Sequence, residues 1–345
     1  MSRHESFMLE AIELSKQGFP APNPRVGCVI VNDDQVVGRG FCKLDGSDHA
    51  EAMALKEARD MANGATAYVT LEPCNHYGKT PPCSQSLLKS GVKRVLFATS
   101  DPNPIAAGGR EFLLANGIQV EHGILAIEAA KVNAQFLFAM KHHRPFVTVK
   151  AGITLDGMVA LPSGESKWIT NEASRQDAMR LRADIGCVMV GRITAEQDRA
   201  RLNLRGIEGA NQPLRVVLDP RSILPSDLPI FDQSAPTLHL TDEQKIQTPS
   251  DVLERIWATG RTGVLIEGGP TTNSRFFDSG LVDRIILYVA PKIFGDGKSW
   301  VGTLGLSEMK DAPEFELVNI ENIEGDLKIS YQSRNLSKYL ESYNM

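Results

Sequence analysis

Two short stretches, His49-Ala50-Glu51 and Pro73-Cys74 with the later Cys83, place an imidazole, two thiols and a carboxylate in the first third of the chain. Imidazole nitrogen and thiolate sulfur are donors that zinc binds readily. A catalytic zinc site uses three protein ligands and leaves a fourth position for water. The stretches therefore predict a zinc site formed by His49, Cys74 and Cys83, with Glu51 beside it and not needed as a ligand.

The pattern is typical of zinc-dependent nucleobase deaminases, whose signature is His-x-Glu followed by Pro-Cys-x-x-Cys. It fits only in part, because the two cysteines are further apart here. In such a site zinc lowers the pKa of bound water to about 7. Glu51 would take the proton of that water and pass it to the ring nitrogen and then to the leaving ammonia. The alternative is a structural zinc closed by a fourth ligand, for which His76 and Cys42 are available.

Composition restricts the class of protein. A chain of 345 residues with 42% apolar and 23% charged side chains is typical of a soluble globular protein with two domains. A net charge of −5 argues against a broad nucleic-acid surface, and no apolar run is long enough to span a membrane. Five cysteines, two of them beside a His-x-Glu, favour metal chemistry in the reducing cytoplasm over a disulfide scaffold.

The first part of the chain alternates helix-like and strand-like patterns, which predicts a layered α/β unit. The expected helices cover 3–17, 49–62, 82–90, 108–116 and 124–139. The expected strands cover 26–31, 36–40, 67–71 and 94–98, the first two paired around the Asn32-Asp33-Asp34 turn.

A basic, turn-like segment, Lys141–Pro145, precedes a new strand at 146–151, and we place the domain boundary there. The predicted domains are 1–144 and 145–345. In the second domain we expect helices at 172–183, 250–259 and 271–279, and further strands at 185–190, 214–218, 263–267 and 284–290.

The second domain lacks the G-x-G-x-x-G fingerprint after its first strand, so a Rossmann fold is not supported. Gly268-Gly269-Pro270-Thr271 instead follows the strand at 263–267 and leads into a helix. Glycines let backbone approach a phosphate, and a helix start offers free N–H donors. The same residues also make an ordinary strand-to-helix turn, so both interpretations stay open.

Several longer motifs extend over nearly the whole chain. In the first half they are Asn23–Val29 (NPRVGCV), His49–Glu51, Thr70–Cys83 (TLEPCNHYGKTPPC) and Asp101–Pro104 (DPNP). In the second half they include Lys150–Gly157 (KAGITLDG), Ser163–Thr170 (SGESKWIT) and Glu267–Thr271 (EGGPT). With these motifs the chain resembles the bifunctional deaminase–reductase family of riboflavin biosynthesis (RibD type). The resemblance implies an α/β protein of two domains, a cytidine-deaminase-like three-layer α/β/α domain followed by a dihydrofolate-reductase-like α/β domain.

For the first domain, the resemblance implies one zinc ion on His49, Cys74 and Cys83 and a proton-donor role for Glu51. The implied substrate contacts in the deaminase pocket are Asn23, Lys79, Asp101 and Asn103. Lys79 could also be a solvated surface lysine. One position departs from the family pattern: Cys42 stands where relatives usually carry histidine, and a thiol is a weaker hydrogen-bond donor.

For the second domain, the resemblance implies an NADPH site and a substrate site. The implied NADPH contacts are Gly152, Trp168, Thr194, Asp198, Gly269, Pro270, Thr271, Thr272, Asn273, Ser274 and Arg275. The implied substrate contacts are Ser166, Arg182, Leu202, Arg205 and Glu267, and Lys150 could orient the ribose C1 carbonyl. Arg182 and Arg205 can bind a phosphate bidentately, although each could otherwise be a surface salt-bridge partner.

The resemblance thus implies a cytoplasmic bifunctional enzyme, a zinc-dependent hydrolase and an NADPH-dependent oxidoreductase, acting on a phosphorylated pyrimidine. It would deaminate 2,5-diamino-6-ribosylamino-4(3H)-pyrimidinone 5′-phosphate and then reduce the ribosyl side chain to ribityl. We expect a homo-oligomer, a dimer or tetramer, with no nucleic-acid or membrane partner. The alternatives are a nucleoside or tRNA deaminase with an accessory C-terminal domain, and a zinc-stabilised binding module.

Overall fold

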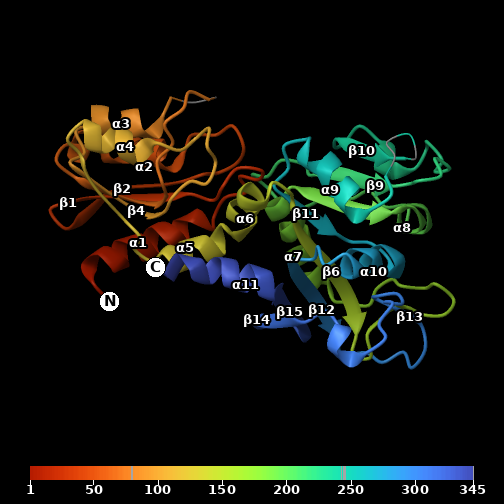
Figure 1. Cartoon of the computed structure of the whole chain (residues 1–345). Coiled ribbons are helices and arrows are strands. Elements are labelled where there is room, and N and C mark those ends of the chain that lie inside the picture. Colours follow the sequence, from red (N-terminus) through yellow and green to blue (C-terminus); the bar gives the residue numbers. More distant parts are fainter. Residues whose placement is uncertain (79–80, 242, 244–245, 345) are drawn as a thin grey trace. The chain divides into compact units, whose positions relative to one another are not determined.

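A computed structural model describes the chain except residues 79, 80, 242, 244, 245 and 345. The chain forms two compact units: Met1–His142 together with the C-terminal residues from Tyr339 on, and His143–Lys338 (Figure 1). The sequence analysis assigned all residues after 144 to the second domain. The last residues instead pack with the first unit, where the Tyr339 ring meets Phe138 edge-on at 5.6 Å.

The first unit is built on a five-stranded sheet with the order β2-β1-β3-β4-β5. Its strands are β1 (Gly27–Asn32), β2 (Gln35–Phe41), β3 (Thr66–Leu71), β4 (Arg94–Thr99) and β5 (Gln119–His122). Strand β1 runs antiparallel to both β2 and β3, whereas β3, β4 and β5 are parallel. The carboxyl ends of β3 and β4 therefore meet at one edge of the sheet, where the Pro73-Cys74 and Asp101–Pro104 segments begin.

Helices cover both faces of this sheet (Figure 1). Helices α1 (Arg3–Ser15) and α5 (Ala126–Val132) pack on one face through a core that includes Met8, Val29 and Leu96. Helices α2 (Ala50–Ala58), α3 (Cys83–Lys89) and α4 (Gly109–Ala115) lie on the other, and α6 (Ala134–His142) follows α5. The predicted three-layer α/β/α arrangement is confirmed.

The second unit contains an eight-stranded sheet with the order β10-β9-β8-β11-β6-β12-β15-β14. Its strands are β6 (Phe146–Thr154), β8 (Cys187–Gly191), β9 (Leu214–Leu218), β10 (Thr237–Leu240), β11 (Gly263–Ile266), β12 (Arg284–Ala290), β14 (Phe315–Ile323) and β15 (Asp326–Ser333). The strands from β10 to β12 are parallel, and β15 and β14 extend the sheet antiparallel. A small separate ribbon pairs β7 (Met158–Ala160) with β13 (Lys298–Ser299).

Helices again cover both faces of the larger sheet. Helices α9 (Pro249–Trp257) and α10 (Pro270–Asp278) pack on one face around Val149, Val264 and Phe276. Helices α7 (Glu172–Ile185) and α8 (Arg192–Gln197) pack on the other, and α11 (Arg334–Glu341) follows β15. Short 3₁₀ turns occupy Arg59–Ala62, Pro229–Phe231, Met309–Asp311 and Ser342–Asn344. No helix in the described part of the chain is long and apolar enough to cross a bilayer.

The sequence predicted most of these elements but missed several. The helix expected at 49–62 ends at Ala58, and the one expected at 124–139 is two helices, α5 and α6. Strands β5, β7, β10, β13, β14 and β15 and helices α8 and α11 were not predicted. Strand β14 is exposed along nearly its whole length, so its residues lack the in–out alternation that identifies a half-buried strand.

Helix α2 lies unusually close to strand β2 because β2 carries glycines where the two meet. A Cβ at Gly40 would lie 2.0 Å from the carbonyl oxygen of Ala50, and one at Gly38 would lie 2.2 Å from that of Ala54. A real side chain cannot occupy either position without moving the helix. This contact therefore sets the position of the first turn of α2, which carries His49 and Glu51.

We expect Gly40→Ala to displace the first turn of α2, because its new Cβ overlaps the Ala50 carbonyl. Overpacking of this kind costs about 1–3 kcal/mol. The variant should bind less zinc per chain and unfold at a lower temperature, measured by metal analysis and thermal unfolding. Gly305→Ala is the control, because a Cβ there meets nothing within 4 Å. Wild-type zinc content and melting temperature in Gly40→Ala would show that the contact does not position the site.

Candidate active sites

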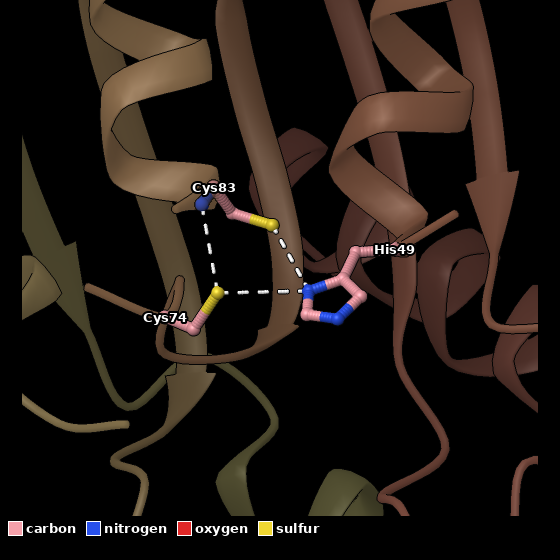
Figure 2. Close-up of side chains that lie close together, drawn as sticks. All are labelled: His49, Cys74 and Cys83. Carbon is pink, nitrogen blue, oxygen red and sulfur yellow. Dashed lines mark hydrogen bonds between the residues drawn. The ribbon is translucent and has the colours of Figure 1, made fainter. Parts of the chain in front are cut away.

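Three elements bring the predicted zinc ligands together. His49 is the N-cap residue of α2, Cys74 follows the end of β3, and Cys83 is the first residue of α3. The Nδ1 atom of His49 lies 3.2 Å from the sulfur of Cys83 and 3.5 Å from that of Cys74. Figure 2 shows the imidazole facing both sulfurs. The ligand atoms all lie within 4.8 Å of one another.

The pKa values of the Cys74 and Cys83 thiols indicate that the pair can bind a cation. A hydrogen bond from Cys83 lowers the pKa of Cys74 to about 4. The same hydrogen bond, together with burial, raises the pKa of Cys83 well above its usual value. One thiolate thus forms readily, and the second forms once a metal ion supplies positive charge, because a coordinated thiol loses its proton. The donor set of one imidazole and two thiolates fits zinc.

No fourth protein ligand joins this group among the described residues. Cys42 and His76, the two candidates for closing a structural site, line the neighbouring cavity and do not belong to the ligand cluster. Burial and the nearby Glu51 raise the pKa of Cys42 to about 12, which keeps its thiol protonated. Three ligands leave one coordination position for a small molecule, as in catalytic zinc sites.

Glu51 lies beside the ligands on the first turn of α2 and is 3% exposed. Burial and the charge of Cys74 raise the pKa of Glu51 to about 7. A carboxyl group with a pKa near neutrality can both accept and release a proton, as a general acid–base catalyst must.

A cavity of about 340 Å³ opens onto Glu51, His49 and Cys74. Asn23, Asp101 and Asn103, three of the substrate contacts predicted from the sequence, line the same cavity. The fourth, Lys79, lies outside the described residues. The volume is that of a small-molecule site.

The cavity also has lining residues that the sequence analysis did not select as contacts, namely Asp45, Ser47, Glu72 and His76. Glu72 accepts hydrogen bonds from the backbone N–H groups of Arg110, at 3.0 Å, and Asp101, at 3.4 Å, and so holds the Asp101 loop against the cavity. Burial raises the pKa of Asp101 to about 6. Glu72 could have been identified from the sequence as a residue of the site, because it directly precedes Pro73-Cys74.

In the second unit, the connections that follow β8 and β11 diverge to opposite faces of the sheet. The chain leaves β8 for α8 and leaves β11 for α10, which pack in different cores. In open α/β sheets, ligands bind in the crevice at such a point, at the carboxyl ends of the strands. Gly191 ends β8, and the segment Glu267–Pro270 follows β11, so both predicted cofactor segments start at this crevice.

Glycines keep this crevice open. A Cβ at Gly191 would lie 2.6 Å from the hydroxyl oxygen of Thr272, and one at Gly269 would lie 3.3 Å from that of Thr194. Gly269 is the N-cap of α10, so the first turn of this helix presents backbone N–H groups there. A cradle of glycine backbone at a helix start fits the phosphates of a dinucleotide such as NADPH.

The side chains of three other predicted cofactor residues have structural partners. The Asn273 amide donates to the Trp300 carbonyl at 2.8 Å, Ser274 donates to the Thr271 carbonyl, and Arg275 donates to the Gln247 carbonyl at 2.8 Å. A cofactor contact in this part of α10 would therefore come mainly from backbone or from Thr271 and Thr272.

The remaining predicted cofactor residues lie on separate segments. Trp168 is 62% exposed, and the Arg175 guanidinium lies 4.7 Å from its ring centroid. Gly152 is on β6, where a Cβ would lie 3.2 Å from the Thr170 side chain. Asp198 is exposed at the C-terminal end of α8.

Lys150, Arg182 and Glu267 form a largely buried charge cluster. The Arg182 guanidinium donates to both carboxylate oxygens of Glu267, at 2.7 and 3.1 Å, and Lys150 Nζ lies 3.5 Å from the same carboxylate. Burial alone would raise the pKa of Glu267, but the charges of Arg182 and Lys150 lower it to about 2. Glu267 is therefore ionised at neutral pH.

Arg182 thus forms a salt bridge, but a buried one instead of the surface one that was the alternative, and its contact with the substrate phosphate stays a prediction. A further nitrogen of its guanidinium donates to the Asn203 carbonyl at 3.2 Å. The other predicted substrate contacts differ in exposure. The Leu202 side chain is 5% exposed within the core, Ser166 is half-buried, and Arg205 is exposed.

Comparison with known protein families divides the chain in the same way. Residues 1–99 match the cytidine and deoxycytidylate deaminase zinc-binding region, and residues 145–329 match the RibD C-terminal domain. The zinc-binding match covers β1 to β4 and all three ligands. The second match covers the charge cluster and the glycine cradle.

Relatives and solved structures that match nearly the whole chain also combine the two domains. The riboflavin biosynthesis protein RibD of Aquifex aeolicus is 36% identical over 349 residues, 95% of this chain and 98% of the relative. RibD of Escherichia coli is 36% identical over 94% of this chain and 97% of its own length.

One structure of Acinetobacter baumannii RibD has a TM-score of 0.87 at 38% identity, over 96% of this chain and 98% of that chain. A diaminohydroxyphosphoribosylaminopyrimidine deaminase/5-amino-6-(5-phosphoribosylamino)uracil reductase of Thermotoga maritima has a TM-score of 0.86 at 34% identity, over 96% of this chain and 99% of that chain. The chain therefore belongs to the RibD family of riboflavin biosynthesis proteins and joins a zinc-dependent deaminase to an NADPH-dependent reductase.

Proposed function

We propose that the first unit hydrolyses the 2-amino group of 2,5-diamino-6-ribosylamino-4(3H)-pyrimidinone 5′-phosphate, and that the second unit then reduces the ribosyl side chain to ribityl. The observation that carries the proposal is the three-ligand cluster with the buried Glu51 at the wall of one cavity. The Thermotoga maritima relative, whose name states both activities, supports this choice of substrate.

In the first unit, zinc supplies Lewis acidity that lowers the pKa of water to about 7. Glu51 takes one proton from the attacking water and delivers it to the pyrimidine ring nitrogen. It then takes the second proton of that water from the hydroxyl of the tetrahedral adduct and delivers it to the amino group, which leaves as ammonia. We assign Asn23, Asp101 and Asn103 to the binding of the ring and sugar, because their polar side chains line the cavity. We assign Lys79, which the sequence predicts as a substrate contact, to the binding of the phosphate.

In the second unit, bound NADPH would supply a hydride to C1 of the ring-opened ribosyl chain, and a proton from solvent would complete the reduction. We assign its binding to Gly152, Trp168, Thr194, Asp198 and the segment Gly269–Arg275, and substrate binding to Ser166, Leu202, Arg205, Glu267 and Lys150. Leu202 can contribute only through its backbone, because its side chain is in the core. Arg182 holds the Glu267 carboxylate in place, and Arg205 is the exposed guanidinium available for the substrate phosphate.

The alternative of a nucleoside or tRNA deaminase with an accessory second domain has less support. Residues 145–329 match a reductase-family domain, and this unit carries both a glycine cradle and a buried charge cluster. The cysteines are all free, which fits the proposed cytoplasmic location.

We expect Glu51→Gln to retain zinc and lose deamination by roughly 10²–10⁴-fold, the usual contribution of general acid–base catalysis. The amide is nearly isosteric but cannot carry the proton. Ammonia release from the diaminopyrimidine phosphate and zinc content measure the two effects. NADPH oxidation with the deaminated substrate should stay at the wild-type rate and serves as the control. Normal ammonia release from this variant would refute the role of Glu51.

The two arginines of the reductase site should respond differently. Arg205→Ala should raise KM for the phosphorylated substrate about tenfold with kcat retained, because it removes one charge-assisted contact. Arg182→Ala should lower kcat and destabilise the second unit by roughly 3 kcal/mol, because it leaves the buried Glu267 with an incomplete ion pair. Steady-state kinetics and thermal unfolding separate the two. An unchanged KM in Arg205→Ala would remove its assignment as the phosphate contact.

We also propose that the chain works as a homo-oligomer through the outer part of the large sheet. Leu317, Ile320 and Leu327 on β14 and β15 are 56, 53 and 37% exposed. Ile320 pairs with Ile329, and Leu317 with Tyr331, so these side chains share one sheet face. Neighbouring exposed apolar side chains of this kind mark protein interfaces.

Replacing Leu317 and Ile320 together by lysine should reduce the mass measured by light scattering to that of a single chain. Met309→Lys is the control, because Met309 is 96% exposed and lies outside the strands. A double variant with the wild-type mass would exclude this face as the interface.

A further inference from the structure

The ammonium of Lys150 lies between a carboxylate and an aromatic ring. On one side its Nζ is 3.5 Å from Glu267, and on another it is 5.7 Å from the ring centroid of Tyr288. Lys150 is on β6 and Tyr288 on β12, and the pairing of Lys150 with Ile286 puts Lys150 and Tyr288 on the same sheet face. The Lys150 side chain is 18% exposed, so water competes little for its charge.

The Tyr288 ring is itself held in place by its hydroxyl group and by its packing against α7. Its hydroxyl donates to the Asp177 carboxylate at 2.5 Å, and the ammonium of Lys328 lies 2.7 Å from the same carboxylate oxygen. Tyr288 is 1% exposed and packs against Ala178 of α7. The ring is thus restricted in rotation and translation, because both its edge and its hydroxyl have fixed partners.

Helix α7 contacts both groups that face Lys150, the Tyr288 ring and the Glu267 carboxylate. Asp177 on α7 anchors the Tyr288 hydroxyl, and Arg182 on the same helix binds the Glu267 carboxylate bidentately. The carboxylate and the aromatic ring that face Lys150 are therefore positioned by one rigid element. The negative ring face attracts an ammonium most strongly where it is desolvated.

We propose that Tyr288 is a positioning residue of the reductase, whose ring face holds the Lys150 ammonium in the direction of the substrate C1. The inference rests on the proposed role of Lys150 in orienting that carbon. The hydroxyl of Tyr288 acts indirectly, since it fixes the ring through Asp177. Tyr288 itself is 1% exposed and acts through Lys150.

The test compares Tyr288→Phe with Tyr288→Met. Both variants remove the hydroxyl and leave Asp177 its Lys328 partner, but only Phe keeps an aromatic face, while Met fills the space flexibly. We expect Tyr288→Phe to keep kcat within about threefold of wild type and Tyr288→Met to lose about tenfold, which corresponds to about 1.4 kcal/mol. KM for NADPH should stay unchanged in both, which reports that the second unit is folded, because deamination depends on the first unit alone. Equal kcat values for the two variants would overturn the inference.

A double-variant cycle identifies the residue through which Tyr288 acts. In a Lys150→Gln background, measured as single-turnover NADPH oxidation, adding Tyr288→Met should cost nothing further, because the ring has no ammonium left to hold. The same tenfold loss in both backgrounds would show that Tyr288 acts through general packing. If Lys150→Gln alone reduces substrate normally, the proposed role of Lys150 fails; if it is impaired and Tyr288→Met is not, only the present inference fails.

Discussion

The close contact between α2 and β2 is the constraint on which the deaminase site depends. Because Gly38 and Gly40 carry no side chain, the first turn of α2 rests directly on the strand. That turn carries His49 and Glu51, while the two thiols come from the end of β3 and the start of α3. Zinc chemistry needs its donors within a few ångströms of one another, so the site exists only where all three elements meet.

The fold explains why Cys74 and Cys83 are further apart in the sequence than in the shorter deaminase signature. Residues between them, including His76 and Gly78, line the cavity next to the zinc ligands. The segment that makes the motif differ from the shorter deaminase signature therefore also builds part of the pocket wall. Together with Asp101 and Asn103 from the end of β4, it gives the cavity polar groups that can bind a small molecule.

The reductase site is organised by charge rather than by metal ligands. Glu267 is buried and ionised because Arg182 and Lys150 compensate its charge, and each of the three comes from a different element. A buried carboxylate without such partners would take up a proton instead. The cluster lies at the carboxyl ends of the parallel strands, beside the glycine cradle, so the fixed charges and the proposed cofactor site share one edge of the sheet.

The sequence by itself determined the zinc ligands, the role open to Glu51 and the alternation of helices and strands, because these depend on residue type and local spacing. It could not predict that Arg182 forms a buried salt bridge, because the partner, Glu267, is distant in the chain. The Leu202 side chain lies in the core for the same reason, whereas β14 was missed because its exposed residues lack the alternation of a half-buried strand. Only the tertiary structure brings together Tyr288, Lys150 and α7, since charge pairing and burial are set by contacts between remote segments.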